Sequence, residues 1–181
     1  MNKNSKQDLI RLLQNAYSGE KAAAYAYRGH AKSVSIAIER EEISKIEHDE
    51  WEHRECLRTM LTSLEAKPRF MREVSMTAVG TLIYCLCRLG GLLNFLNFGW
   101  YMSMYGAGKL ERSNIGEYEV AALIARACGQ AQFVEELIHM AEVEWDHEMY
   151  FRSKALTSRW AKVIPVWSLP PPRDFTRQNL K

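Results

Sequence analysis

The sequence predicts an all-α protein, a four-helix bundle in which a long apolar crossover connects two helical hairpins. Apolar residues recur at helical spacing along most of the chain, and no stretch alternates between apolar and polar residues as a strand would. The predicted helices are joined by two short turns and by one connection of roughly fifty residues, an order of connections typical of one class of four-helix bundle.

Two long helical segments form the predicted first hairpin. The first runs from about Lys6 to Lys32, and the second from about Ile36 to Leu64. The second segment ends before Lys67-Pro68, because proline disfavours helix at the residue that precedes it.

The connection that follows is almost free of charge. From Met76 to Gly108 the one charged residue is Arg88. Two interpretations stay open: a crossover helix followed by the buried start of the next bundle helix, or a surface that enters a bilayer interface or receives an apolar substrate. Such an apolar face could also be buried in a homodimer.

A second hairpin is predicted from about Asn114 to Cys128 and from about Gln132 to Lys162, with Gly129 placed just after the end of its first helix. Pro165 and the prolines at 170–172 then predict an extended tail over residues 165–181. Residues 1–164 are left for the bundle domain.

The bulk composition excludes several classes of protein. The net charge of +2 gives no basis for nucleic-acid binding, which needs concentrated positive charge. The four cysteines form no C-x-x-C pair, so zinc-ribbon and rubredoxin-type sites are not expected. Charged residues stand where a signal peptide would have an apolar run, which predicts a cytoplasmic protein, with the inner face of the membrane as a peripheral location.

The chemistry is predicted by a motif that each half of the chain contains once. Each copy has Gly-Glu, then a predicted hairpin turn, then Glu-Trp-acid-His. The Glu and the His of the second part are three residues apart, so they share one helix face and can reach the same metal ion. The six candidate metal ligands are Glu20, Glu50, His53, Glu117, Glu144 and His147.

These ligand types indicate which metal the site would hold. Four carboxylates and two imidazoles suit iron or manganese, because oxygen-rich sites favour the harder divalent ions and the set contains no thiolate. Four negative charges nearly balance two divalent cations, and without metal they would repel one another. The sequence therefore predicts two iron ions, with manganese as the alternative.

The ligand from the third helix is less determined than the others. Glu117 lies about as far before the predicted turn as Glu144 lies after it, but Glu111 and Glu119 are alternatives. Asn114 could also cap a helix whose capping box Glu117 closes.

Other polar and aromatic residues near the motifs have less specific interpretations. Asp146 or Glu47 could hydrogen-bond a ligating imidazole. Two tryptophans, Trp51 and Trp145, are predicted to pack rather than to transfer electrons. Three histidines lack the paired spacing and are predicted to be ordinary: His30, His48 and His139.

At these motifs the chain resembles the ferritin-like di-iron carboxylate superfamily, and within it most closely the demethoxyubiquinone hydroxylases of ubiquinone biosynthesis. The matching features, over about residues 7 to 156, are AYSGEKAAAYAYRGH, DEWEHRECL, the KPR step, YGAGK and EVEWDHE. The resemblance implies that the six candidate residues bind iron and that Glu50 and Glu144 bridge the two ions.

The resemblance further implies a di-iron monooxygenase. Such an enzyme activates dioxygen with electrons from a donor and hydroxylates a quinone-like or other apolar aromatic substrate at a membrane surface. Two alternatives stay open beside it: a soluble ferritin- or rubrerythrin-like protein that oxidises iron or reduces peroxide, and a helical interaction module with vestigial ligands.

Overall fold

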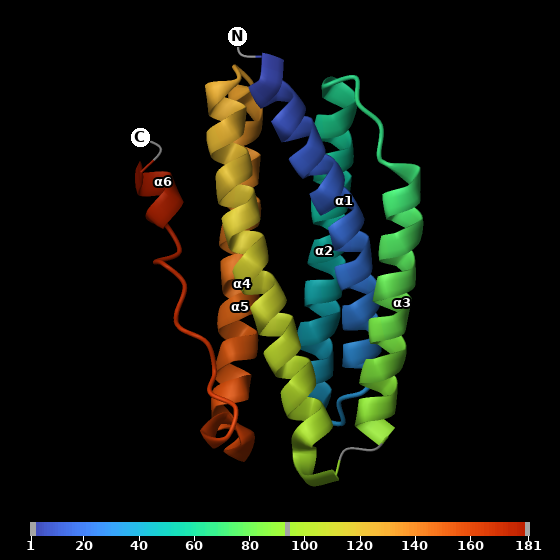
Figure 1. Cartoon of the computed structure of the whole chain (residues 1–181). Coiled ribbons are helices and arrows are strands. Elements are labelled where there is room, and N and C mark those ends of the chain that lie inside the picture. The colour runs from blue at the N-terminus through green and yellow to red at the C-terminus, as the bar shows by residue number, and fades with distance from the viewer. Residues whose placement is uncertain (1–2, 93–94, 180–181) are drawn as a thin grey trace. The chain divides into compact units, whose positions relative to one another are not determined.

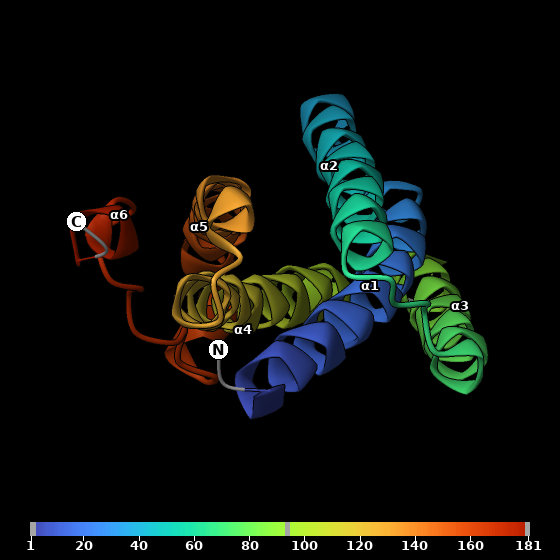
Figure 2. The same ribbon diagram turned by 90° about the horizontal axis from the view of Figure 1, so that it is seen from above.

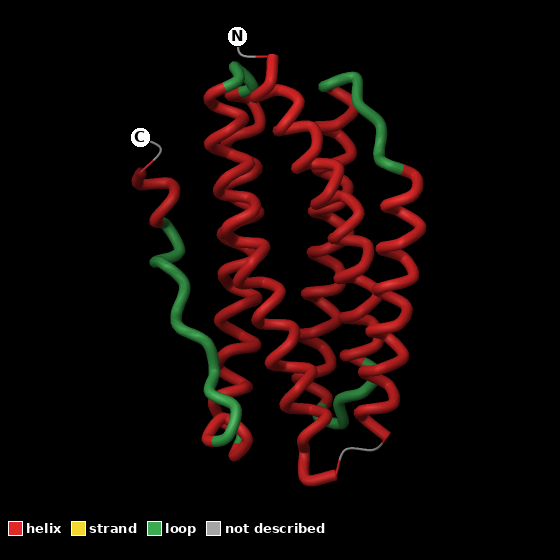
Figure 3. Tube along the Cα trace, viewed as in Figure 1, coloured by secondary structure: helices red, strands yellow, loops and turns green. Residues whose placement is uncertain are grey.

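The fold was derived from a computed structural model that describes residues 3–92 and 95–179. Helices make up nearly all of this part of the chain, and it contains no strand (Figures 1 and 3). The all-α prediction is confirmed. The α-helices are α1 (Lys3–Ala31), α2 (Ala37–Ser63), α3 (Phe70–Leu92), α4 (Phe98–Ala127), α5 (Val134–Thr157) and α6 (Phe175–Asn179).

The chain divides into two compact units. One unit is Ile10–Ser103, and the other combines Met1–Leu9 with Met104–Lys181. The first therefore holds most of α1, all of α2 and α3, and the first turn of α4. The second holds the rest of α4, α5 and the C-terminal tail. The tail is therefore part of the same compact unit as α4 and α5. Leu93 and Asn94 of the predicted crossover, and Leu180 and Lys181 of the predicted tail, lie outside the described residues.

The hairpin of α1 and α2 matches the sequence prediction to within a few residues at each end. Glu65, with φ of 57°, ends α2 in the left-handed region. The backbone N–H of Ala66 then donates to Leu61 O at 2.9 Å, and that of Glu65 donates to Thr62 O at 3.0 Å. This pair of bonds is the Schellman motif, which satisfies carbonyls that the helix end leaves open.

Helix α3 packs against α1 at a very short distance between backbones. A methyl group added at Gly80 would lie 2.7 Å from the carbonyl oxygen of Ala22, and one at Gly29 would overlap the backbone of Tyr84. Glycine is required at these two positions because any side chain would force the helices apart. Figures 1 and 2 show α3 beside α1 along most of its length.

Helix α2 is joined to α3 through one arginine. The guanidinium of Arg54 forms an ion pair with Glu73 of α3, and it lies 3.6 Å from the ring centroid of Tyr17 in α1. The three helices of this unit are thus held together by glycine contacts between α1 and α3 and by a part-buried ion pair between α2 and α3.

The predicted crossover does contain a helix, but its outer face is not buried. Apolar side chains are exposed along α3, among them Met71, Leu82, Leu86 and Leu89. By length and composition alone, α3 is long enough and apolar enough to cross a membrane. Of the two interpretations of the crossover, a helix followed by the partly buried start of the next one describes the secondary structure, and the membrane or substrate surface stays a prediction.

Helix α4 begins at Phe98 rather than near Asn114, so the predicted start of the third bundle helix is wrong. Before it, Leu96 and Asn97 have positive φ angles of 56° and 61°, which change the direction of the chain. The predicted end is confirmed. Gly129 has φ of 78°, and the next residue, Gln130, donates its N–H to Ala125 O at 2.8 Å.

Helix α5 and the tail complete the second unit. α5 ends at Thr157, and a short 3-10 turn, Arg159–Lys162, follows it. Residues 165–170 are extended, as the prolines predict, but the tail is not extended throughout, because it ends in α6. Figure 1 shows the tail returning along α5.

Candidate metal centre

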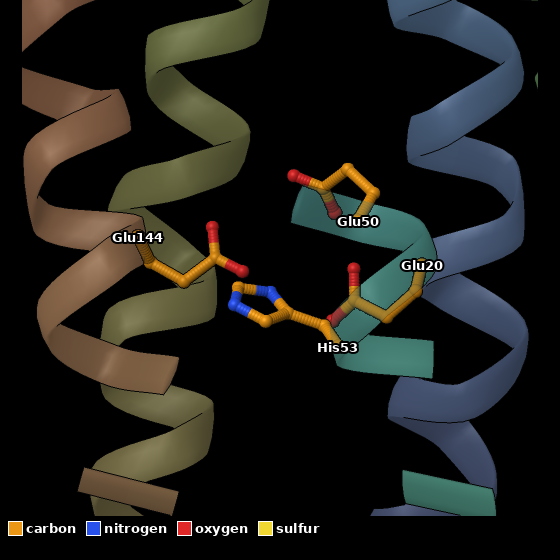
Figure 4. Close-up of side chains that lie close together, drawn as sticks. All are labelled: Glu20, Glu50, His53 and Glu144. Atoms are coloured by element: carbon orange, nitrogen blue, oxygen red, sulfur yellow. The ribbon is translucent and has the colours of Figure 1, made fainter. Parts of the chain in front are cut away.

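In the first unit, the structure brings together three of the predicted ligands. Glu20 from α1 and Glu50 and His53 from α2 each offer one ligand atom, and these atoms lie within 4.8 Å of one another. Figure 4 shows the three side chains projecting from the two helices toward the same side. Their exposed fractions are 3%, 0% and 5%, so water has little access to the first triad.

The surroundings of the first triad are small and apolar. On α1, Ala23, Ala24 and Tyr27 follow Glu20 within two helical turns, and all three are buried. On α2, the buried residues Ile46 and Leu57 lie one turn on either side of the motif. The helical period therefore places the ligands on the buried faces of both helices, next to apolar side chains of the same helices.

The second unit contains a triad of the same composition. Glu111 from α4 and Glu144 and His147 from α5 have ligand atoms within 4.8 Å of one another. Nδ1 of His147 lies 3.8 Å from Oε2 of Glu144. Both glutamates are fully buried, and His147 is 5% exposed.

Glu111 belongs to this triad, and Glu117 does not. Glu117 is only half-buried, whereas Glu111 lies on the buried stripe that also contains Met104, Ile115 and Tyr118. Distance from the turn fixes only the level of a residue along the helix, whereas the stripe fixes its face, and a six-residue step changes the face. The structure thus brings Glu111, an alternative that the sequence had left open, to the triad, and it does not bring Glu117 there.

The capping interpretation of Asn114 is also wrong. Asn114 lies in the middle of α4, where its side-chain amide donates to Oε2 of Glu111 at 3.2 Å. This bond holds the Glu111 carboxylate from one turn along the same helix. The other alternative, Glu119, accepts a hydrogen bond from the hydroxyl of Thr176 in the tail.

Each residue proposed to hydrogen-bond an imidazole pairs with an arginine. Glu47 pairs with Arg28, and Asp146 pairs with Arg173. Of the two motif tryptophans, one packs against an aromatic ring and the other hydrogen-bonds the C-terminal tail. Trp51 makes an edge contact with Tyr25 at 5.9 Å between ring centroids, and the indole N–H of Trp145 donates to the carbonyl of Pro171.

The three other histidines take no part in either triad. His48 is exposed and pairs with Glu52, and His139 is exposed. His30 is buried, and burial lowers its pKa to about 4, because the interior disfavours the charged imidazolium.

Sequence reasoning missed two residues beside the second triad. Glu148 is fully buried next to His147, and burial raises the pKa of its carboxyl. The indole N–H of Trp167, from the tail, donates to Oε1 of Glu148 at 2.6 Å. The four-residue step from Glu144 to Glu148 keeps both on one helix face and could have revealed Glu148. No local spacing could have revealed Trp167.

Each triad has the geometry and chemistry to bind a divalent metal ion. Ligand atoms that are each about 2.1 Å from one ion lie at most about 4.2 Å apart, so a separation within 4.8 Å needs only small side-chain shifts. Two carboxylates and one imidazole leave further coordination positions for another ligand or a reactant. Without a counter-charge, two buried carboxylates in each triad would repel, so both triads fit a cation.

Comparisons of this chain with protein families, with curated proteins and with solved structures found no match.

Proposed function

We propose that the chain is a ferritin-like di-iron protein in which α1, α2, α4 and α5 form a four-helix bundle and the two triads together hold a pair of iron ions. The observation that carries the proposal is the repetition. Each helical hairpin presents two glutamates and one histidine, all buried, with the second Glu and the His three residues apart. A bundle with one Glu and one Glu-x-x-His from each half is an arrangement known for di-iron and di-manganese carboxylate proteins.

The charges of the six ligands favour a pair of divalent ions. Four carboxylates contribute four negative charges, which two divalent cations balance. The set has four oxygen donors and two imidazole donors, and it has no thiolate, so iron or manganese suits it better than zinc or copper. Manganese remains the alternative metal.

The activity that suits this site best is hydroxylation of an apolar aromatic or quinone-like substrate. Bound ferrous iron would supply the electrons and the Lewis acidity that activate dioxygen. In the balanced reaction one oxygen atom enters a C–H bond of the substrate, and the other leaves as water with two electrons and two protons from a donor.

The chain's own residues would hold the metals and keep water away. Glu50 and Glu144, which are fully buried, would hold the ions together with His53 and His147 from the same helices, and Glu20 and Glu111 would bind from the facing helices. The alanines and Tyr27 beside Glu20 make a dry wall, which strengthens electrostatic interactions and limits side reactions.

The exposed apolar face of α3 supports a substrate or partner of low polarity. We propose that this face lies against the cytoplasmic side of a membrane, where an apolar substrate would be dissolved. A homodimer that buries the same face is the competing explanation.

Reconstitution with ferrous iron tests the proposed metal site. Purified apo-protein should bind about two iron ions per chain, and an absorption band should develop when the loaded protein meets air. A double variant, Glu50→Ala with Glu144→Ala, should bind neither ion. Wild-type protein that takes up no iron would overturn the proposal.

A second experiment separates the hydroxylase from a soluble iron-oxidising or peroxide-reducing protein. Flotation with liposomes should carry wild-type protein to the lipid fraction, and replacement of Leu82 and Leu86 by Gln should abolish flotation. Protein that stays in solution as a dimer would favour the soluble alternative. Iron-loaded protein that oxidises iron but forms no hydroxylated product from an apolar quinol would also favour the soluble alternative.

A further inference from the structure

The C-terminal tail is fixed to the second unit at several points along α5. Its arginines pair with acidic residues of that helix: Arg173 with Asp146 at 2.8 Å, and Arg177 with Glu142 at 2.7 Å. The side chains of Arg173 and Asp146 are 42% and 52% exposed, so this pair contributes little to stability. Glu142 is buried, so its pair with Arg177 fixes the end of the tail more firmly.

Trp167 fixes the start of the tail, and its indole contacts two helices. On α4, a methyl group added at Gly108 would overlap the six-membered ring of Trp167. The ring also meets Tyr105 edge-on, with 5.3 Å between centroids. On α5, Glu148 accepts the indole N–H at 2.6 Å. One side chain thus contacts α4 and α5 at the same level.

That level is the level of the second triad. Gly108 is one helical turn before Glu111 on α4, and Glu148 is the residue after His147 on α5. The triad needs its α4 ligand and its two α5 ligands at a fixed separation, and a side chain wedged against both helices beside them sets that separation. Ligands that are displaced by about 1 Å bind a metal poorly, so supporting contacts have large effects.

We propose that Trp167 is a positioning residue for the Glu111, Glu144 and His147 triad, acting through Gly108 on one helix and Glu148 on the other. This inference rests on the proposed metal-binding function. It assigns the tail a role in shaping the metal site, although residues 165–170 and the triad are separated in sequence by much of α5.

Cobalt(II) binding to the full-length chain tests the proposal, because the visible absorption of bound cobalt reports the geometry of its ligands. Trp167→Phe keeps an aromatic ring beside Tyr105 but removes the N–H that Glu148 accepts. Gly108→Ala pushes the indole away. Gly106→Ala is the matched control, because nothing lies within 4 Å of a methyl group there.

Trp167→Phe and Gly108→Ala are expected to weaken cobalt binding about 10- to 100-fold and to change the shape of the visible spectrum, whereas Gly106→Ala should do neither. Circular dichroism of the metal-free variants identifies any that fail to fold, and Trp167→Phe decides the matter if Gly108→Ala does not fold. Wild-type affinity and spectrum in folded Trp167→Phe overturn the positioning role and leave the proposed function intact. A wild-type chain that binds no cobalt overturns both.

Discussion

The two triads have the same ligands, but different elements support them. In the first unit, a complete helix, α3, packs against α1. Gly80 of α3 contacts Ala22 of α1, which is two residues after Glu20. In the second unit, an extended tail presses on α4 through Trp167 at Gly108, one turn from Glu111. A glycine permits the close approach in both cases: Gly80 on α3, which faces the helix of Glu20, and Gly108 on the helix of Glu111 itself.

The difference shows which part of such a site is local and which is not. A Glu-x-x-His pair lies on one helix, so its geometry follows from the helical period alone. The remaining glutamate comes from a neighbouring helix, and its place depends on whatever sets the distance and offset between the two helices. In this chain we expect α3 to set the position of Glu20 in the first unit and the tail to set the position of Glu111 in the second.

Substitution of the α4 glutamates should have the largest effect on metal binding, and it tests which glutamate completes the second triad. Glu111→Gln removes a charged ligand and should weaken binding of ferrous iron by at least about 100-fold. Glu117→Gln, the matched control on the same helix, should leave binding unchanged because Glu117 lies outside the triad. Calorimetric titration under anaerobic conditions measures both, and the reverse result would restore Glu117 as the ligand.

The first unit should also have a pH dependence of its own, because His30 is buried in α1. Its folded pKa of about 4 lies below the unfolded value of 6.5, so the unfolded chain gains a proton first as the pH falls. Stability is full above pH 6.5 and should decrease by about 3 kcal/mol by pH 4.

Chemical unfolding at several pH values checks this expectation. His30→Leu should flatten the dependence between pH 6.5 and 4, and His139→Leu, which changes an exposed histidine, should retain it. An unchanged slope in His30→Leu would contradict the assignment.

Adding a methyl group at the glycine contact between α3 and α1 should have an intermediate effect on stability. Gly80→Ala places a methyl group 2.7 Å from the carbonyl oxygen of Ala22 and should destabilise the protein by about 1–3 kcal/mol. Gly19→Ala has free space around it and should stabilise α1 by about 0.5–1 kcal/mol. Thermal unfolding measures both, and equal changes in the two variants would mean that α3 does not press on α1.

The charged contacts of the tail should matter least. Arg173→Ala removes an exposed pair with Asp146 and should cost less than about 1 kcal/mol. Unfolding in urea gives this value, and Trp167→Phe in the same assay should cost more. A larger loss in Arg173→Ala would make charge, rather than the indole, the anchor of the tail.

Much of the fold follows from helical periodicity, but the start of α4 does not. The segment before it is uncharged, so it has no polar face from which a period can be read. Just before α4, Leu96 and Asn97 take positive φ angles, which their residue types do not predict. The C-terminal end was predictable, since Gly129 has the conformation that favours glycine.

The candidate site divides in the same way. Glu50 with His53, and Glu144 with His147, were predictable because each pair depends only on a three-residue step. Glu111 was left as an alternative, because distance from a turn fixes the level of a residue along the helix but not its face. The role of Trp167 depends on a tail that folds back across most of α5, and no local pattern encodes such a contact.

The central claim is that the two triads share one pair of metal ions, and anomalous X-ray scattering from crystals grown with ferrous iron or manganese tests it most directly. The account predicts two anomalous peaks about 3.5–4 Å apart, with ligands from both Glu-x-x-His motifs and from Glu20 and Glu111. A single peak at one triad, two peaks far apart, or none at these residues would contradict it.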